Sequence, residues 1–126
     1  MDTLADAINI IKTHEYVGKE ECVINSTKLV KSVLEAMKRS SYIIGYEEFA
    51  DRNAKKLKVY LSRKINDIGI IKPRFSISKD RIQYYESRYV PSRDFGILII
   101  STSEGVLTSR EIKEKKIGGR LLAYVY

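Results

Sequence analysis

The sequence predicts an α+β protein of two small lobes. Amphipathic helical spacing occurs twice in the first half of the chain, whereas short apolar runs typical of strands dominate the second half. The pattern changes between residues 63 and 73, where Pro73 biases the preceding residue to extended backbone. We therefore expect an N-terminal αβαββ lobe over residues 1–66 and a mostly β C-terminal lobe with a short helix over residues 67–126.

Two helices are expected in the N-terminal lobe. Asp2 or Thr3 can cap the first, whose apolar residues recur at helical spacing. Asn25, Ser26 or Thr27 caps the second, whose apolar positions follow the i, i+1, i+4, i+5, i+8 stripe of an amphipathic helix. The apolar faces consist of Leu4, Ile8 and Ile11 in the first helix, and of Leu29, Val30, Val33, Leu34 and Met37 in the second.

Three strands complete this lobe. Residues 19–25 are predicted to form a short strand between the two helices, and residues 42–49 and 56–61 follow the second helix. Apolar and polar residues alternate in the last of these segments, as expected for a strand with one buried face. The polar residues 51–53 suit a hairpin turn between the second and third strands.

The C-terminal lobe begins with extended segments and can form a short helix over residues 81–89. The other elements that we expect are a buried strand, a helix and a final strand, over residues 96–100, 108–116 and 120–126. Thr108 and Glu111 fit a capping box, in which the two residues satisfy each other's free backbone N–H groups.

The net charge of +7 and the pI of about 9.5 favour an anionic partner. Residues 1–62 hold ten Lys and Arg against nine Asp and Glu, whereas residues 63–126 hold thirteen against seven. The basic character therefore lies in the second half, and a polyanion is expected to dock mainly there. Taken alone, this composition is equally consistent with an ordinary solvated basic face.

Membrane, metal and cofactor classes find no support in the sequence. No apolar run approaches the roughly 20 residues of a membrane span, and the first residues lack a signal-peptide pattern, so we expect a cytoplasmic protein. Cys22 is the only cysteine, which excludes an internal disulfide and a multi-cysteine metal cluster, and we expect it to be buried. The sequence predicts neither a cofactor nor a metal ion.

Catalytic motifs are also weak. Residues 94–96 match the Asp-Phe-Gly tripeptide of protein kinases, but the other kinase loops are absent and the chain is too short. A hydrolase would have to use the single histidine, His14, with a serine such as Ser103 far along the sequence. The paired glutamates at 20–21 and 47–48 lie in predicted strands, where neighbouring side chains point to opposite faces. We expect no enzyme.

Three consecutive hydroxyl residues form the most distinctive candidate site. Ser101, Thr102 and Ser103 leave the end of the predicted buried strand, and Gly105 allows the following turn to adopt positive φ. Small hydroxyl side chains both donate and accept hydrogen bonds, which suits the base edges, 2′-hydroxyls and phosphates of a folded RNA. The alternative is an ordinary loop, since such clusters are common after strands.

Basic and aromatic residues interleave before this segment: Lys72, Arg74, Lys79, Arg81, Tyr84, Tyr85, Arg88, Tyr89 and Arg93. Tyrosine and arginine planes can stack on unpaired bases, and the cations can neutralise phosphates. Some of these tyrosines can equally fill the core of a chain that has no tryptophan.

The whole chain resembles the universal small-subunit ribosomal protein S-eight family. The motifs that carry the resemblance are Leu-Ala-Asp-Ala-Ile at 4–8, Ile-Lys-Pro-Arg-Phe at 71–75, Pro-Ser-Arg-Asp-Phe-Gly at 91–96, the Ser-Thr-Ser segment, and Gly-Gly followed by Leu-Leu-Ala-Tyr-Val-Tyr at the end. The Lys-Pro-Arg-Phe, Arg-Asp-Phe-Gly and terminal segments are similar to the archaeal branch more than to the bacterial one. The hairpin at residues 50–56 departs from the family, because it lacks the glycines that are common there.

This resemblance implies a two-lobe α+β protein of the small ribosomal subunit. It would bind a helical segment of the central domain of the small-subunit ribosomal RNA, lie beside other small-subunit proteins and take no small-molecule substrate. The RNA-binding residues that we expect are Ser101, Thr102, Ser103 and Gly105 as the main contact, with Gly118, Gly119 and Tyr124 alongside, Arg93 in the basic region, and Thr3, Lys28 and Lys31 in the N-terminal lobe. The alternative is a nonspecific single-stranded nucleic-acid-binding protein that uses the Tyr/Arg region.

Overall fold

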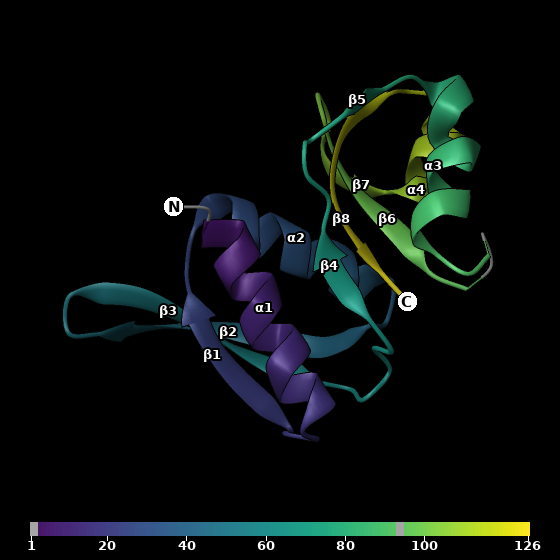
Figure 1. Cartoon of the computed structure of the whole chain (residues 1–126). Helices are drawn as coiled ribbons and strands as arrows, with labels where there is room; N and C mark the ends of the chain where they lie inside the picture. The colour runs from purple at the N-terminus through teal and green to yellow at the C-terminus, as the bar shows by residue number, and fades with distance from the viewer. Residues whose placement is uncertain (1–2, 93–94) are drawn as a thin grey trace. The chain divides into compact units, whose positions relative to one another are not determined.

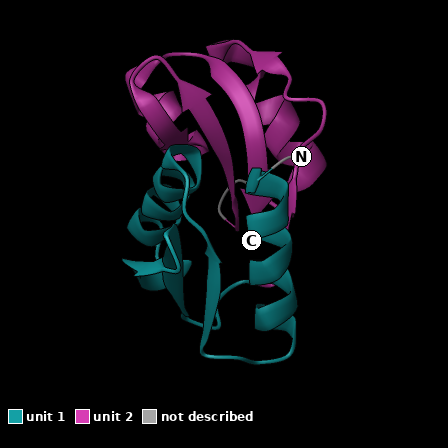
Figure 2. Ribbon diagram, turned by 90° about the vertical axis from the view of Figure 1, so that its left-hand side faces the viewer, with its two compact units in different colours: residues 1–65 teal, residues 66–126 magenta. Residues whose placement is uncertain are grey.

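The elements of this computed structural model, which describes residues 3–92 and 95–126, gather into two units, residues 1–65 and 66–126 (Figure 2). Each unit combines helices with an antiparallel sheet, which confirms the α+β class with two lobes. That the second unit is the RNA-binding domain stays a prediction.

The first unit has the predicted αβαββ order (Figure 1). Its elements are α1 (Thr3–Tyr16), β1 (Glu21–Asn25), α2 (Lys28–Arg39), β2 (Ile43–Asp51) and β3 (Ala54–Leu61). The three strands form one sheet in the order β1-β3-β2, with both pairs antiparallel. On β3, the buried Leu57, Val59 and Leu61 alternate with partly exposed residues, so one face of the sheet packs into the core.

Of the three candidate caps for the second helix, Asn25, Ser26 and Thr27, the structure has Thr27. The hydroxyl of Thr27 accepts a hydrogen bond from the Val30 amide at 3.1 Å. The predicted apolar stripe is buried except at Leu29, which is partly exposed. For the first helix, Thr3 is already helical and is therefore not the cap, while Asp2 lies outside the described residues.

The hairpin between β2 and β3 turns on two residues, Arg52 and Asn53, with φ values of 49° and 69°. Positive φ at both positions identifies the turn as type I′, whose twist matches that of paired strands. Because the turn uses only two residues, pairing extends to Asp51 and Ala54. Both strands are therefore longer at the turn than the sequence suggested.

The second unit contains a five-stranded sheet and two α-helices. Its elements are β4 (Ile68–Ile70), β5 (Ser76–Ile77), a 3-10 turn η1 (Lys79–Arg81), α3 (Ile82–Tyr89), β6 (Ile97–Thr102), β7 (Gly105–Thr108), α4 (Ser109–Lys115) and β8 (Gly119–Val125). The strands run in the order β4-β8-β6-β7, and β5 also pairs with β8. The central strand β8 therefore has three partners.

Two expectations for this unit were wrong in detail. The strand predicted at 96–100 continues through Ser101 and Thr102, and the segment after it is the strand β7 rather than a loop. A two-residue turn at Ser103 and Glu104 joins them, with Thr102 paired to Gly105. A four-residue strand that opens on glycine carries too little apolar pattern to be recognised. The short helix that could form over residues 81–89 is present as α3.

Helices α3 and α4 pack on one face of the sheet (Figure 1). Leu98 and Ile100 of β6 and Leu121 of β8 form a core with Ile82 of α3 and Ile112 of α4. The predicted capping box starts α4. The Thr108 amide donates to Glu111 Oε1 at 2.9 Å, and the Thr108 hydroxyl accepts from the Glu111 amide at 3.3 Å.

An ion pair between a buried carboxylate and an exposed lysine joins the two helices. Glu86 of α3 is only 2% exposed, and its Oε1 lies 2.5 Å from Lys113 Nζ of α4. Among the described residues, neither carboxylate oxygen has a hydrogen-bond partner that could supplement this ion pair. The carboxylate therefore depends on Lys113 for compensation of its charge.

We predict that Lys113→Met lowers the free energy of unfolding by about 1–3 kcal/mol, because it leaves a buried carboxylate without its partner. Urea unfolding followed by circular dichroism measures the change. The matched control is Lys115→Met, which removes the 3.2 Å pair between two exposed side chains, Lys115 and Glu104. The control is expected to cost no more than about 1 kcal/mol. Equal costs for the two variants would show that Glu86 does not depend on Lys113.

Candidate nucleic-acid interface

One end of the second unit's sheet brings most of the predicted RNA-binding residues together. Ser101 of β6 pairs with Arg120 of β8, and Thr102 pairs with Gly105 of β7. Gly119 opens β8 directly before Arg120, so it lies at the same end. We call this region the hydroxyl edge and define it as residues 101–105 and 118–120.

The three hydroxyl residues have different roles. The Thr102 hydroxyl donates to the Gly105 carbonyl at 2.7 Å and accepts from the Glu104 amide at 3.0 Å. It therefore closes the β6–β7 turn, with Gly105 at a φ of +109° that side-chain-bearing residues rarely adopt. The Thr102 hydroxyl therefore has partners within the turn, and its role in RNA binding stays a prediction.

The other two hydroxyls are available to a ligand. Ser103 is exposed in the turn, and Ser101 is partly exposed on the strand. Neither side chain has a hydrogen-bond partner within residues 3–92 and 95–126. Each can thus donate one hydrogen bond and accept others on a backbone that the sheet holds in place.

Gly118 and Gly119 allow β8 to approach its neighbours closely. A Cβ on Gly119 would lie 2.4 Å from the Ser101 carbonyl oxygen, and one on Gly118 would lie 2.4 Å from the Ile77 carbonyl oxygen. Real Cβ atoms essentially never come this close, so each position requires the missing side chain. Gly119 therefore lets β8 pack directly against the backbone of Ser101, and Gly118 does the same at Ile77.

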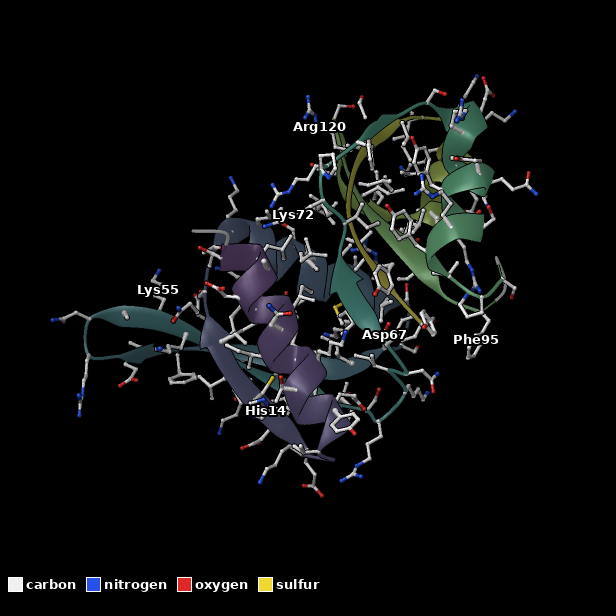
Figure 3. All side chains as sticks on the ribbon, viewed as in Figure 1. His14, Lys55, Asp67, Lys72, Phe95 and Arg120 are labelled. Carbon is white, nitrogen blue, oxygen red and sulfur yellow. The ribbon has the colours of Figure 1, made fainter. Side chains whose placement is uncertain are left out.

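Arg120 is the residue that the sequence analysis missed. It is exposed and pairs directly with Ser101 on one side and with Ser76 of β5 on the other (Figure 3). Directly paired residues share a face of the sheet with Cβ atoms about 5 Å apart. The position of Arg120 directly after the Gly-Gly pair could have suggested it as a candidate. Its pairing with Ser101 could not be read from the sequence.

Tyr124 lies elsewhere on the same strand. It is four residues beyond Arg120, or about 13 Å at the usual strand rise. Its hydroxyl donates to Asp67 Oδ2 at 3.2 Å, and its ring stacks on Tyr89 and Tyr126 at centroid distances of 5.9 and 6.2 Å. Burial raises the pKa of Tyr124, and the charge of Asp67 raises it further. The structure thus gives this tyrosine intramolecular partners and does not place it at the hydroxyl edge.

The candidates in the first unit lie at the start of its helices. Thr3 opens α1, while Lys28 and Lys31 lie in the first turn of α2. Lys28 is exposed, but Lys31 Nζ lies 3.0 Å from Glu48 Oε2. Hydrogen bonds from Ser26 and then Lys31 lower the pKa of Glu48, so the carboxylate stays charged beside Lys31. Lys28 is consequently the freer cation.

The remaining predictions divide between surface and core. Cys22 is buried, and the partly exposed Tyr85 and Tyr89 pack against the core of the second unit, whereas Tyr84, Arg81 and Arg88 are exposed. Arg93 lies outside the described residues.

His14 belongs to the first unit and Ser103 to the second. In the part of the chain that the structure describes, no group of three His, Cys, Asp or Glu side chains could hold a metal ion.

Comparison with known proteins decides the family. The model of the family described as "Ribosomal protein S8" matches residues 2–126. The chain belongs to this family. The family assignment that the sequence motifs suggested is therefore confirmed.

Three archaeal members of the family are similar to the chain over nearly its full length. The "Small ribosomal subunit protein uS8" of Archaeoglobus fulgidus is 46% identical over 127 residues, which cover 100% of this chain and 98% of the relative. The proteins of the same name from Thermoplasma volcanium and Thermoplasma acidophilum are each 43% identical over 126 residues, with 99% and 98% coverage. The expected similarity to the archaeal branch is confirmed. No helix among the described residues is long and apolar enough to cross a membrane.

We predict that Gly119→Ala lowers the free energy of unfolding by about 1–3 kcal/mol, because the new methyl group forces β8 away from the Ser101 carbonyl. Denaturant unfolding measures the loss. Gly45→Ala is the matched control, since a Cβ on this strand glycine meets nothing within 4 Å. It is expected to change little or to stabilise by up to about 1 kcal/mol. A Gly119 variant as stable as the control would contradict the close approach.

Proposed function

We propose that the chain is a non-enzymatic structural constituent of the small ribosomal subunit in the cytoplasm, and that it binds a helical segment in the central domain of the small-subunit ribosomal RNA. Its partners are this RNA and neighbouring small-subunit proteins. The observation that carries the proposal is the match to the ribosomal protein S8 family over residues 2–126, together with two free hydroxyls beside an exposed arginine.

The hydroxyl edge suits recognition of RNA shape. Ser101 and Ser103 supply donors and acceptors for 2′-hydroxyls, base edges and phosphate oxygens, and Arg120 supplies charge for a phosphate. Gly118 and Gly119 carry no side chains, so the RNA backbone can come close to the protein backbone there. Thr102 and Gly105 support this contact by fixing the turn.

Further contacts are proposed outside the hydroxyl edge. Thr3, Lys28 and Lys31 form a second contact from the first unit, where Lys28 offers the less neutralised charge. Arg93 adds a phosphate contact from the basic region. Tyr124 acts from its own position on β8, with the Asp67 hydrogen bond holding its ring.

A nonspecific single-strand binder is the alternative. A filter-binding assay distinguishes the two functions. It measures binding of a central-domain rRNA fragment across a salt series, with excess transfer RNA as competitor. Saturable binding that survives the competitor supports specific recognition. Binding that transfer RNA or random single strands abolish would reduce the function to general polyanion binding.

In this assay Ser103→Ala is expected to weaken binding of the rRNA fragment about 5- to 100-fold, because an interfacial hydrogen bond loses its protein partner. Ser40→Ala is the control, since this serine ends α2 and belongs to no proposed contact. Wild-type affinity in the Ser103 variant would refute the assignment of the hydroxyl edge.

Arg120→Ala tests the electrostatic part of the contact. Removing one phosphate contact should lower the slope of log K against log salt by roughly 0.7–0.9. Lys38→Ala removes an exposed charge from the end of α2 and should leave the slope unchanged. An unchanged slope for Arg120→Ala would show that this arginine contacts no phosphate.

A further inference from the structure

The outer face of α3 presents an aromatic ring that is both exposed and held in place. Tyr84 is 48% exposed. Its ring meets Tyr85 edge-on at a centroid distance of 5.2 Å, and Tyr85 stacks on Phe75 at 5.8 Å. Phe75 and Tyr85 pack against the core of the second unit. The ring is therefore anchored against the core while about half of the residue stays exposed to solvent.

Two arginines flank this ring. The guanidinium carbon of Arg81 lies 4.9 Å from the centroid of Tyr84, and that of Arg88 lies 6.0 Å from it. Arg81 ends the 3-10 turn η1 directly before α3, while Tyr84 and Arg88 lie four positions apart on one side of the helix. Cation–π contacts of this kind favour extended, ordered guanidinium groups. We call Arg81, Tyr84 and Arg88 the α3 platform.

Within the described residues, no carboxylate neutralises the charge of the α3 platform. Among the described residues, none has a carboxylate within 4 Å of either guanidinium. The single acidic residue of α3, Glu86, is buried on the opposite side of the helix and paired with Lys113. Both arginines thus keep free N–H donors on an exposed surface, where an anion can accept them.

From this arrangement we propose that the α3 platform binds an unpaired nucleotide of RNA. The base stacks against Tyr84 and the guanidinium planes, and a phosphate oxygen accepts hydrogen bonds from Arg81 or Arg88. A nucleotide uses both the ring and the charge, whereas an acidic protein segment would use only the arginines. The choice of RNA rests on the proposed function, but the surface shares no residue with the hydroxyl edge.

The test uses the full chain and a fluorescein-labelled 12-residue oligouridylate, followed by fluorescence anisotropy. A 12-residue abasic oligonucleotide carries the phosphates without the bases. The wild-type protein should bind the oligouridylate more tightly than the abasic strand. Tyr84→Ala should weaken oligouridylate binding about fivefold or more, in line with the loss of one stacked base. Tyr84→Phe keeps the ring and should bind like the wild type.

Two further variants control for folding and for charge. Tyr16→Ala removes a tyrosine that is 90% exposed at the end of α1 and should leave binding unchanged. The double variant Arg81→Lys with Arg88→Lys preserves charge but removes the planar groups, so it should narrow the difference between the oligouridylate and the abasic strand. Circular dichroism establishes that each variant is folded.

Three results would overturn the proposal: no binding of oligouridylate by the wild type, equal binding by Tyr84→Ala, or displacement by polyglutamate as effective as by unlabelled oligouridylate. The last result would assign the platform to an acidic protein segment. Ser103→Ala should not change oligouridylate binding. In the filter-binding assay, the Tyr84→Ala variant should still bind the rRNA fragment in the presence of excess transfer RNA. Failure of the platform and failure of the hydroxyl edge are therefore distinguishable.

Discussion

The close approach of β8 to its neighbours is the constraint on which the candidate site depends. A strand that pairs with β4, β5 and β6 must bring its first residues within backbone contact of Ile77 and Ser101. Only residues without a Cβ fit there, and the sequence supplies Gly118 and Gly119 in succession. The same contact sets the register that pairs Ser101 with Arg120. The two glycines therefore have two effects. They let β8 approach its neighbours closely, and, since they carry no side chains, they leave the edge of the sheet accessible to a ligand.

The layer beneath this edge explains why it can be rigid. Helices α3 and α4 cover the sheet through an apolar core, the capping box fixes where α4 starts, and the Glu86–Lys113 pair joins the helices. The Thr102 hydroxyl forms hydrogen bonds to the Glu104 amide and the Gly105 carbonyl within the β6–β7 turn. These bonds hold the backbone that carries Ser103 in place. Binding a ligand at Ser101 and Ser103 then costs less free energy than it would on a flexible loop, because the backbone is already ordered. Such a preorganised surface favours a ligand whose shape already matches it.

The sequence predicts well what depends on local pattern. The apolar stripe of α2, its threonine cap and the capping box of α4 were all readable, because each follows from residues within one or two turns. Strand β7 was not, since four residues that begin with glycine gain their structure from pairing with β6. Other features depend on how distant segments pair, which no local pattern encodes. They include the pairing of Arg120 with Ser101, the hydrogen bond of Tyr124 to Asp67, and the question of which hydroxyl is free. The family resemblance supplied candidate residues but could not distinguish those that bind from those that support.

The distribution of charge gives a further step. Lys113 and Lys115 of the basic second half are paired with Glu86 and Glu104, so part of their charge is already compensated within the unit. Three of the exposed arginines lie at two separate places, Arg120 at the hydroxyl edge and Arg81 with Arg88 around Tyr84. Of these two places, only the first carries serine hydroxyls that have no hydrogen-bond partner among the described residues. Salt dependence should therefore arise from both places, whereas discrimination between folded RNAs should arise from the hydroxyl edge alone, because unpaired bases stack on the α3 platform whatever their sequence.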